Sequence, residues 1–149
     1  MRGRTQLRRA GTLAVLAGVS LVACGSSAAD EPEGDGPASV EAIAGSDLAR
    51  VTITDDAARR IGLHTALVET ASGTAETQIP YAAVLYDPDG RSWAFIKSDE
   101  LTFERAAIEV DHIDGGVAFL SNGPEVGTEV VTTGAPQLYG AETGVGEDE

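Results

Sequence analysis

The chain has 149 residues, enough for one domain, and a globular composition with 42% hydrophobic and 23% charged residues. Its 24 acidic residues outnumber 10 Lys and Arg, which excludes a nucleic-acid binder because such proteins set basic side chains against phosphate. A single cysteine excludes an internal disulfide and a cysteine-ligated zinc cluster.

Residues 1–23 have the features of an export signal. Four arginines and no acidic residue accompany an apolar run over 12–23, which is shorter than the roughly 20 residues of a membrane-spanning helix. The run ends in LVAC, with Cys24 last, and this pattern resembles the lipobox of bacterial lipoproteins. The resemblance implies that the signal is cleaved before Cys24 and that membrane lipid is attached to its sulfur. We therefore expect a lipid-anchored protein on the extracytoplasmic face of the cell membrane; a free or buried Cys24 is the alternative.

Residues 24–47 are predicted to form a disordered acidic tether. They hold six acidic residues, no basic residue and many Gly, Ser, Ala and Pro, so they bury too little apolar surface to fold. A flexible coil of this length spans roughly 25–30 Å. Without the leader the charge is 6 − 24 = −18. Residues 143–149 form a second acidic segment, predicted to be a tail.

The folded domain is expected at 48–142, and it begins with a strand at 51–54. Thr54 is a suitable N-cap for a short helix at 55–61, since two aspartates follow it and two arginines come late in the helix. Gly62 is expected to end this helix. Further strands are predicted at 64–69 and 75–79.

The pattern of a β-hairpin begins after Pro80. Apolar runs at 82–86 and 92–96 flank the turn sequence DPDG, in which Gly90 suits a positive φ. Strands are then predicted at 103–110, 117–120 and 129–133, separated by glycine-bearing turns. The fold class is therefore mainly β: a small antiparallel β-roll or barrel with one short helix.

Two segments of this domain resemble a known family. The sequence IPYAAV at 79–84 with WAFI at 93–96, and SNGPEVG at 121–127 with EVV at 129–131, resemble the membrane-proximal β-domain of periplasmic adaptor proteins, the haemolysin-D-like membrane fusion proteins of efflux and secretion pumps. The motif and turn residues are Pro80, Ala83, Val84, Gly90, Gly123, Gly127, Val130, Val131 and Gly134. The resemblance implies binding to a membrane transporter subunit.

This chain also departs from the family. A complete adaptor has a lipoyl domain and usually a long helical hairpin, whereas Glu69 here runs almost directly into Pro80. Pro124 stands where the family usually has Leu. The parts of an adaptor that reach a distant outer-membrane channel are therefore missing between these segments.

Catalysis is not indicated by the residues. His112 lies in DHID, which permits a metal site or a base–carboxylate pair, but it lacks the ligand spacing of known zinc motifs, so a solvated histidine is the favoured interpretation. The DPDG turn lacks the distal glutamate of a calcium loop. No phosphate-binding loop or serine elbow is present in the sequence. We expect no enzyme activity, no cofactor and no metal.

Two functions from different classes remain open. The first is an adaptor-like accessory protein that binds a membrane transporter, and the second is a stand-alone lipoprotein module that binds a small ligand, a metal or a cell-wall component. Leu138 and Tyr139 are candidate interface residues, with core packing as the alternative. Trp93, Phe95 and Tyr86 form a second candidate patch, for which core packing is again the alternative. The transported substrate, the partner and the oligomeric state are not encoded in any recognisable motif.

Overall fold

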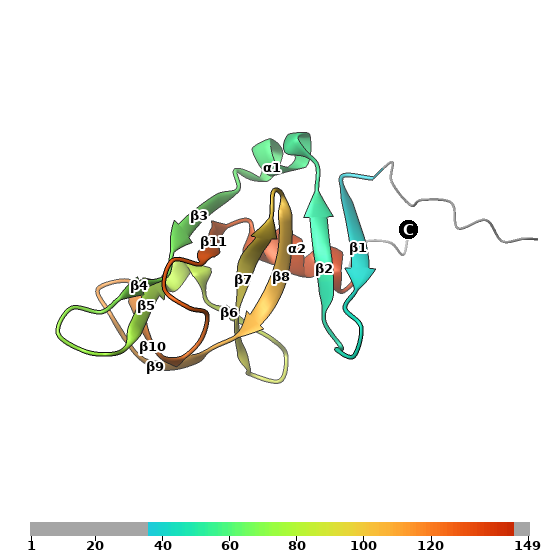
Figure 1. Ribbon diagram of the computed structural model, residues 1–149. Coiled ribbons are helices and arrows are strands. Elements are labelled where there is room, and N and C mark those ends of the chain that lie inside the picture. The colour runs from blue at the N-terminus through green and yellow to red at the C-terminus, as the bar shows by residue number, and fades with distance from the viewer. Residues whose placement is uncertain (1–35, 145–149) are drawn as a thin grey trace, which may run out of the picture. The chain divides into compact units, whose positions relative to one another are not determined.

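The structure is a computed structural model that describes residues 36–144, which fold into two antiparallel β-sheets with short helices (Figure 1). Sheet A has the strand order β1 (Ala38–Ala42), β2 (Ala49–Ile53), β8 (Thr102–Ala107), β7 (Ser92–Asp99), β11 (Glu129–Thr133) and β3 (His64–Leu67), and β6 (Leu85–Tyr86) also pairs with β7. Sheet B has the order β4 (Glu69–Thr70), β5 (Thr77–Pro80), β10 (Val117–Asn122) and β9 (Glu109–Asp114). The mainly β prediction is confirmed, although the sheets do not close into a barrel.

Two hydrophobic cores lie on opposite faces of sheet A. Phe95 and Phe103 belong to the core that contains residues of both helices, α1 (Asp55–Ile61) and α2 (Ala135–Glu142). Ala94 belongs to the other core, with Ile79 and Leu120 of sheet B. Successive side chains of β7 therefore enter different cores, as the period of two in a strand requires. Burial on both faces explains why the sequence of β7 begins as a continuous apolar run.

The predicted helix at 55–61 is confirmed together with both of its ends. The Thr54 hydroxyl accepts a hydrogen bond of 3.2 Å from the Ala57 N–H, which satisfies a backbone donor of the first turn. Gly62 adopts φ 62° and ends the helix in the left-handed conformation. No helix within residues 36–144 is long and apolar enough to cross a membrane.

The predicted hairpin after Pro80 is present but shorter than expected. The expected strand 82–86 begins instead as a 3-10 turn, η1 (Tyr81–Ala83), and only β6 pairs with β7, through Leu85 opposite Trp93 and Tyr86 opposite Ser92. The turn arises because the Tyr81 N–H donates to the Gly116 carbonyl and the Val84 N–H donates back to the Tyr81 carbonyl. The predicted strand 103–110 is likewise divided, since β8 ends at Ala107 in sheet A and β9 begins in sheet B.

The prediction of a disordered tether over 24–47 is wrong for its second half. Residues 38–42 form β1, which pairs with β2 from Ala38 opposite Ile53 to Ala42 opposite Ala49. The backbone of this local hairpin supplies the hydrogen bonds, and Ala38 packs against the core beside both helices, so few apolar side chains are needed. The fold therefore begins about ten residues earlier than the predicted boundary at Leu48. Residues 24–35 of the predicted tether lie outside the described residues.

The helix α2 was not expected from the sequence, and it changes the status of one predicted interface residue. Leu138 is only 1% exposed and belongs to the core with Phe95, so it is not available to a partner. The helix starts after Gly134, which has a positive φ of 100°. Gly127 also has a positive φ, of 92°. Tyr139 stays partly exposed, and its ring lies 5.1 Å from the Arg105 guanidinium.

Candidate functional site

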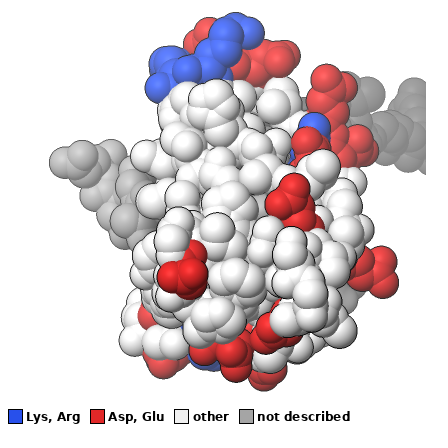
Figure 2. All heavy atoms as spheres, turned by 90° about the vertical axis from the view of Figure 1, so that its left-hand side faces the viewer, with Lys and Arg blue, Asp and Glu red and all other residues white. Residues whose placement is uncertain are grey.

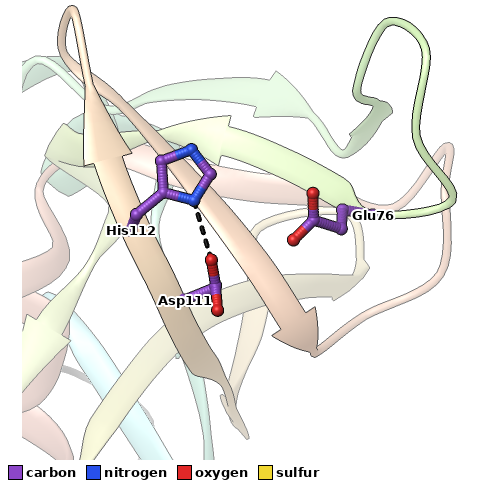
Figure 3. Close-up of side chains that lie close together, drawn as sticks. All are labelled: Glu76, Asp111 and His112. Carbon is purple, nitrogen blue, oxygen red and sulfur yellow. Dashed lines mark hydrogen bonds and ion pairs between the residues drawn. The ribbon is translucent and has the colours of Figure 1, made fainter.

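One end of sheet B brings together three side chains with metal-binding or proton-binding atoms. Glu76 lies just before β5, and Asp111 and His112 lie in β9 (Figure 3). Their nearest ligand atoms all lie within 4.8 Å of one another. We call these three residues the rim cluster.

A β-bulge aims two of these side chains in the same direction. In the pairing of β9 with β10, His112 lies opposite Phe119 and Val110 lies opposite Leu120, so Asp111 is an extra residue without a partner. Neighbouring side chains of a regular strand point to opposite faces, and the bulge interrupts that alternation. As a result, the Asp111 carboxylate reaches the His112 Nδ1 at 2.9 Å (Figure 3).

The His112 ring is held by packing as well as by this hydrogen bond. It stacks on the Phe119 ring with the centroids 4.3 Å apart and the planes 3° from parallel. Phe119 pairs with Gln78 on its other side, and Glu76 lies two residues before Gln78, so the rim cluster combines β5, β10 and β9. The imidazole is therefore positioned by a neighbouring strand before any ligand arrives.

The charge of the rim cluster is not balanced by basic side chains. All six Lys and Arg within residues 36–144 form ion pairs elsewhere: Arg50, Arg59, Arg60, Arg91, Lys97 and Arg105. Glu76 has no ion pair among the described residues, and the His112 ring is the only basic group that contacts Asp111 there. Two carboxylates therefore lie close together with only an imidazole as a neighbouring basic group in this part of the chain.

A groove adjoins the rim cluster and shares Glu76 with it. It has a volume of about 470 Å³ and runs between the start of β5 and the loop after β10. Its walls include Gly123 and Pro124, which belong to the segment whose sequence resembles the adaptor family. A Cβ on Gly123 would lie 2.9 Å from the Leu120 side chain, so glycine allows the loop to pass close to the core.

The second polar cluster of the domain surrounds a buried carboxylate. The Asp87 carboxylate accepts hydrogen bonds from the N–H groups of Asp89 (3.0 Å) and Arg91 (2.9 Å), from the Arg91 Nε (2.8 Å) and from the Trp93 Nε1 (3.0 Å). Burial alone would raise the pKa of Asp87, but the hydrogen bonds from Trp93 and Arg91 and the charge of Arg91 outweigh it and lower the pKa. The predicted DPDG turn is therefore confirmed, and it also holds the indole in place.

Arg105 extends this cluster toward α2. Its guanidinium lies 4.8 Å from the Trp93 ring and 5.1 Å from the Tyr139 ring, within cation–π range of both. The Arg105 and Glu142 side chains are 10% and 3% exposed and form an ion pair. The paired atoms face each other without an aligned hydrogen bond, and neither has another partner among the described residues. We call Asp87, Arg91, Trp93, Arg105 and Glu142 the Trp93 cluster.

The motif residues predicted from the sequence do not converge on one site. Pro80 ends β5, and Ala83 and Val84 pack in or against the core that joins the two sheets. Val130 belongs to that core and Val131 to the opposite one. Gly90, Gly127 and Gly134 all hold positive φ angles in turns. Cys24 lies outside the described residues.

The structure differs from the predictions for the aromatic patch and for the acidic site residues. Phe95 and Trp93 are buried, whereas Tyr86 is exposed and lies opposite Ser92 rather than beside the indole, so the three do not form a docking patch. Glu76 was not identified at all. It stands 35 residues before Asp111 (111 − 76), and only the pairing of β5, β10 and β9 brings the two together.

The chain matches no family model, no curated protein and no solved structure. The likeness to periplasmic adaptors therefore stays a prediction from the residues quoted above.

Proposed function

We propose that this protein is a non-enzymatic accessory protein, anchored by lipid at Cys24 to the extracytoplasmic face of the membrane, that docks onto a membrane transporter subunit. The observation that supports the proposal is the small number of residues between the predicted anchor at Cys24 and the first strand of the fold. From Cys24 to the first residue of β1 there are 38 − 24 = 14 residue steps. Even a fully extended chain of that length spans at most about 50 Å. A lipidated domain is thus held near the membrane, where an integral membrane protein is the nearest class of partner.

A surface near the β3 end of sheet A has the features of a docking site. Leu67 and Val126 are 54% and 56% exposed, unusually high for large aliphatic side chains. They adjoin Val68 and Gly127, which are joined by a backbone hydrogen bond of 2.9 Å, so both belong to one edge of the fold. We call Leu67 and Val126 the apolar edge.

The distribution of charge supports docking on the side of sheet B. Figure 2 views the domain from that side and shows basic and acidic side chains together over α1 at the top, further acidic ones at the right and along the lower edge, and an area between them with few charges. Surfaces depleted of charge and carrying exposed aliphatic residues are typical of protein interfaces.

The proposal is tested by site-specific crosslinking with the full chain in native membranes. A photo-crosslinking residue at Val126 or Leu67 should capture a polytopic transporter subunit, identified by mass spectrometry. Val40 provides a matched control, because it is also a large aliphatic residue, 45% exposed, but lies on the edge strand β1 of sheet A. Equal capture from Val40, or capture of a solute-importer complex, would contradict the proposal. Cys24→Ala should abolish both fatty-acid labelling and capture.

The alternative function is a stand-alone lipoprotein module that binds a small ligand, a metal or a cell-wall component. The rim cluster is the specific observation that favours it, because its two carboxylates and imidazole have no basic partner from Lys or Arg in the described part of the chain. Crosslinking that captures no membrane protein from either position of the apolar edge would favour this alternative.

A further inference from the structure

We propose that the rim cluster is a binding site for a divalent transition-metal cation such as Zn²⁺, with Glu76, Asp111 and His112 as ligands. This inference stands apart from the docking proposal, because the rim cluster and the apolar edge share no residue. It also revises the expectation of no metal site, which depended on ligand spacing along the sequence. The ligands come from the segment just before β5 and from β9, so no linear motif reveals them.

The donor set decides which cation fits. One imidazole nitrogen and two carboxylates match the mixed nitrogen and oxygen ligands of Zn²⁺, whereas Mg²⁺ and Ca²⁺ prefer oxygen ligands alone. With bonds of about 2.0–2.2 Å, tetrahedral Zn²⁺ ligands lie about 3.3–3.6 Å apart. The rim cluster starts from separations within 4.8 Å, so modest side-chain rotation closes it around an ion.

The imidazole and one carboxylate are positioned in advance by features that have separate causes. The β-bulge sends the Asp111 carboxylate to the His112 ring, and the Phe119 ring fixes the plane of that imidazole from another strand. Binding at such a site orders mainly the Glu76 side chain. Less conformational entropy is lost than at a site whose three ligands all have to be ordered.

Electrostatics favour a cation at the rim cluster. All six Lys and Arg of residues 36–144 are engaged elsewhere, so the neighbouring carboxylates of Glu76 and Asp111 have no permanent positive charge beside them. In the Trp93 cluster, by contrast, Arg91 and Arg105 already neutralise Asp87 and Glu142. A bound cation would relieve the repulsion between the rim carboxylates.

Three protein ligands leave room for water or a further ligand on the metal. Zinc sites with three protein ligands keep an open position, whereas closed structural sites have four. Asp111 and His112 are exposed, so an ion here would be in contact with solvent and the adjoining groove. We therefore expect exchangeable binding rather than a metal on which folding depends.

The test is isothermal titration of the detergent-solubilised full chain with ZnCl₂. One Zn²⁺ should bind for each chain, and excess Mg²⁺ should not compete. His112→Ala and Glu76→Gln should each weaken Zn²⁺ binding by about ten-fold or more, the range expected when an element of a metal site is lost. Fluorescence of Trp93, the sole tryptophan, checks that each variant is folded.

Two controls make the result specific. His64→Ala removes the other histidine, which is also exposed and lies in β3, and Glu125→Gln removes an exposed carboxylate of the same groove. Both should bind Zn²⁺ as the wild type does. The proposal is overturned if the wild type binds no Zn²⁺, if His112→Ala binds it unchanged, or if His64→Ala loses it equally.

Discussion

The Trp93 cluster and the rim cluster both bring acidic and basic side chains together beside the β-sheets, but they are organised in opposite ways. In the Trp93 cluster each buried carboxylate forms an ion pair with an arginine. The rings of Trp93 and of the neighbouring Tyr139 pack against the Arg105 guanidinium. In the rim cluster Asp111 contacts an exposed imidazole, and Glu76 lies close to both without an ion pair among the described residues. Buried carboxylates paired with arginines stabilise the fold, whereas carboxylates without a Lys or Arg partner at the edge of a sheet are available to bind a ligand.

We expect substitutions in the two clusters to change the free energy of unfolding by different amounts. Groups that are paired and buried leave an uncompensated charge behind when one partner is removed, and that loss is large. Removing one partner of an exposed ion pair lowers the free energy of unfolding only slightly. Water replaces the missing partner, and ion pairs are weak in a high dielectric. Variants in the two clusters therefore distinguish a structural role from a binding role.

Arg105→Ala should have the largest effect. It leaves the Glu142 carboxylate buried without its cation and removes the contacts with Trp93 and Tyr139, so we expect a loss of about 3 kcal/mol in the free energy of unfolding. Chemical denaturation followed by Trp93 fluorescence measures it. Arg50→Ala is the matched control, since its pair with Glu104 is more exposed and should be worth less than about 1 kcal/mol. Equal losses in the two variants would show that enclosure of the Arg105 pair contributes nothing.

Asp87→Asn should come next and should change the response to acid. The pKa of Asp87 in the fold lies below its unfolded value of about 3.9, so the carboxylate stabilises the protein above about pH 4, and that contribution is lost as the pH falls through the folded pKa. The wild type should therefore lose more stability than Asp87→Asn between pH 5 and 2, a range set by that shift. Asp89→Asn, at the exposed side of the same turn, should keep the wild-type response. If Asp87→Asn lost as much stability in acid as the wild type, the Asp87 carboxylate would not be a source of the pH dependence.

Removal of β1 should have a smaller effect that is still measurable. A chain that begins at Leu48 lacks the five residue pairs between β1 and β2 and the contact of Ala38 with the core. We expect the melting temperature to fall by at least about 4–8 °C, equivalent to about 1 kcal/mol for a domain of this size. An unchanged melting temperature would mean that the segment is the tether predicted from its composition.

Local signals in the sequence predicted much of the fold. The helix at 55–61 was predicted because Thr54 and Gly62 act within one turn of it, and the DPDG turn because proline and glycine fix its backbone. The strand β1 was missed because its stability comes from backbone pairing with β2, which composition does not report. The helix α2 was missed because its short sequence carries no hydroxyl or carboxylate cap at Gly134.

The candidate site was less accessible to sequence reasoning than the fold. The DHID sequence drew attention to His112, but nothing local indicates that Asp111 is the extra residue of a bulge. Glu76 joins the cluster only through the pairing of β5 with β10 and of β10 with β9. Leu138 illustrates the opposite error, because an apolar residue near an acidic end had the features of a surface contact until α2 placed it in the core.

The most direct test of the two-cluster account is a comparison of urea unfolding midpoints, without added metal, for Asp87→Asn and for the double variant Glu76→Gln/Asp111→Asn. Both replace carboxylates by amides of nearly the same shape. We predict that Asp87→Asn lowers the midpoint, whereas the double variant leaves it unchanged or raises it slightly, because repulsion between the partly exposed Glu76 carboxylate and the exposed Asp111 carboxylate is relieved. A double variant that is destabilised as much as Asp87→Asn would contradict the account, because the rim carboxylates would then be part of the structure rather than free for a ligand.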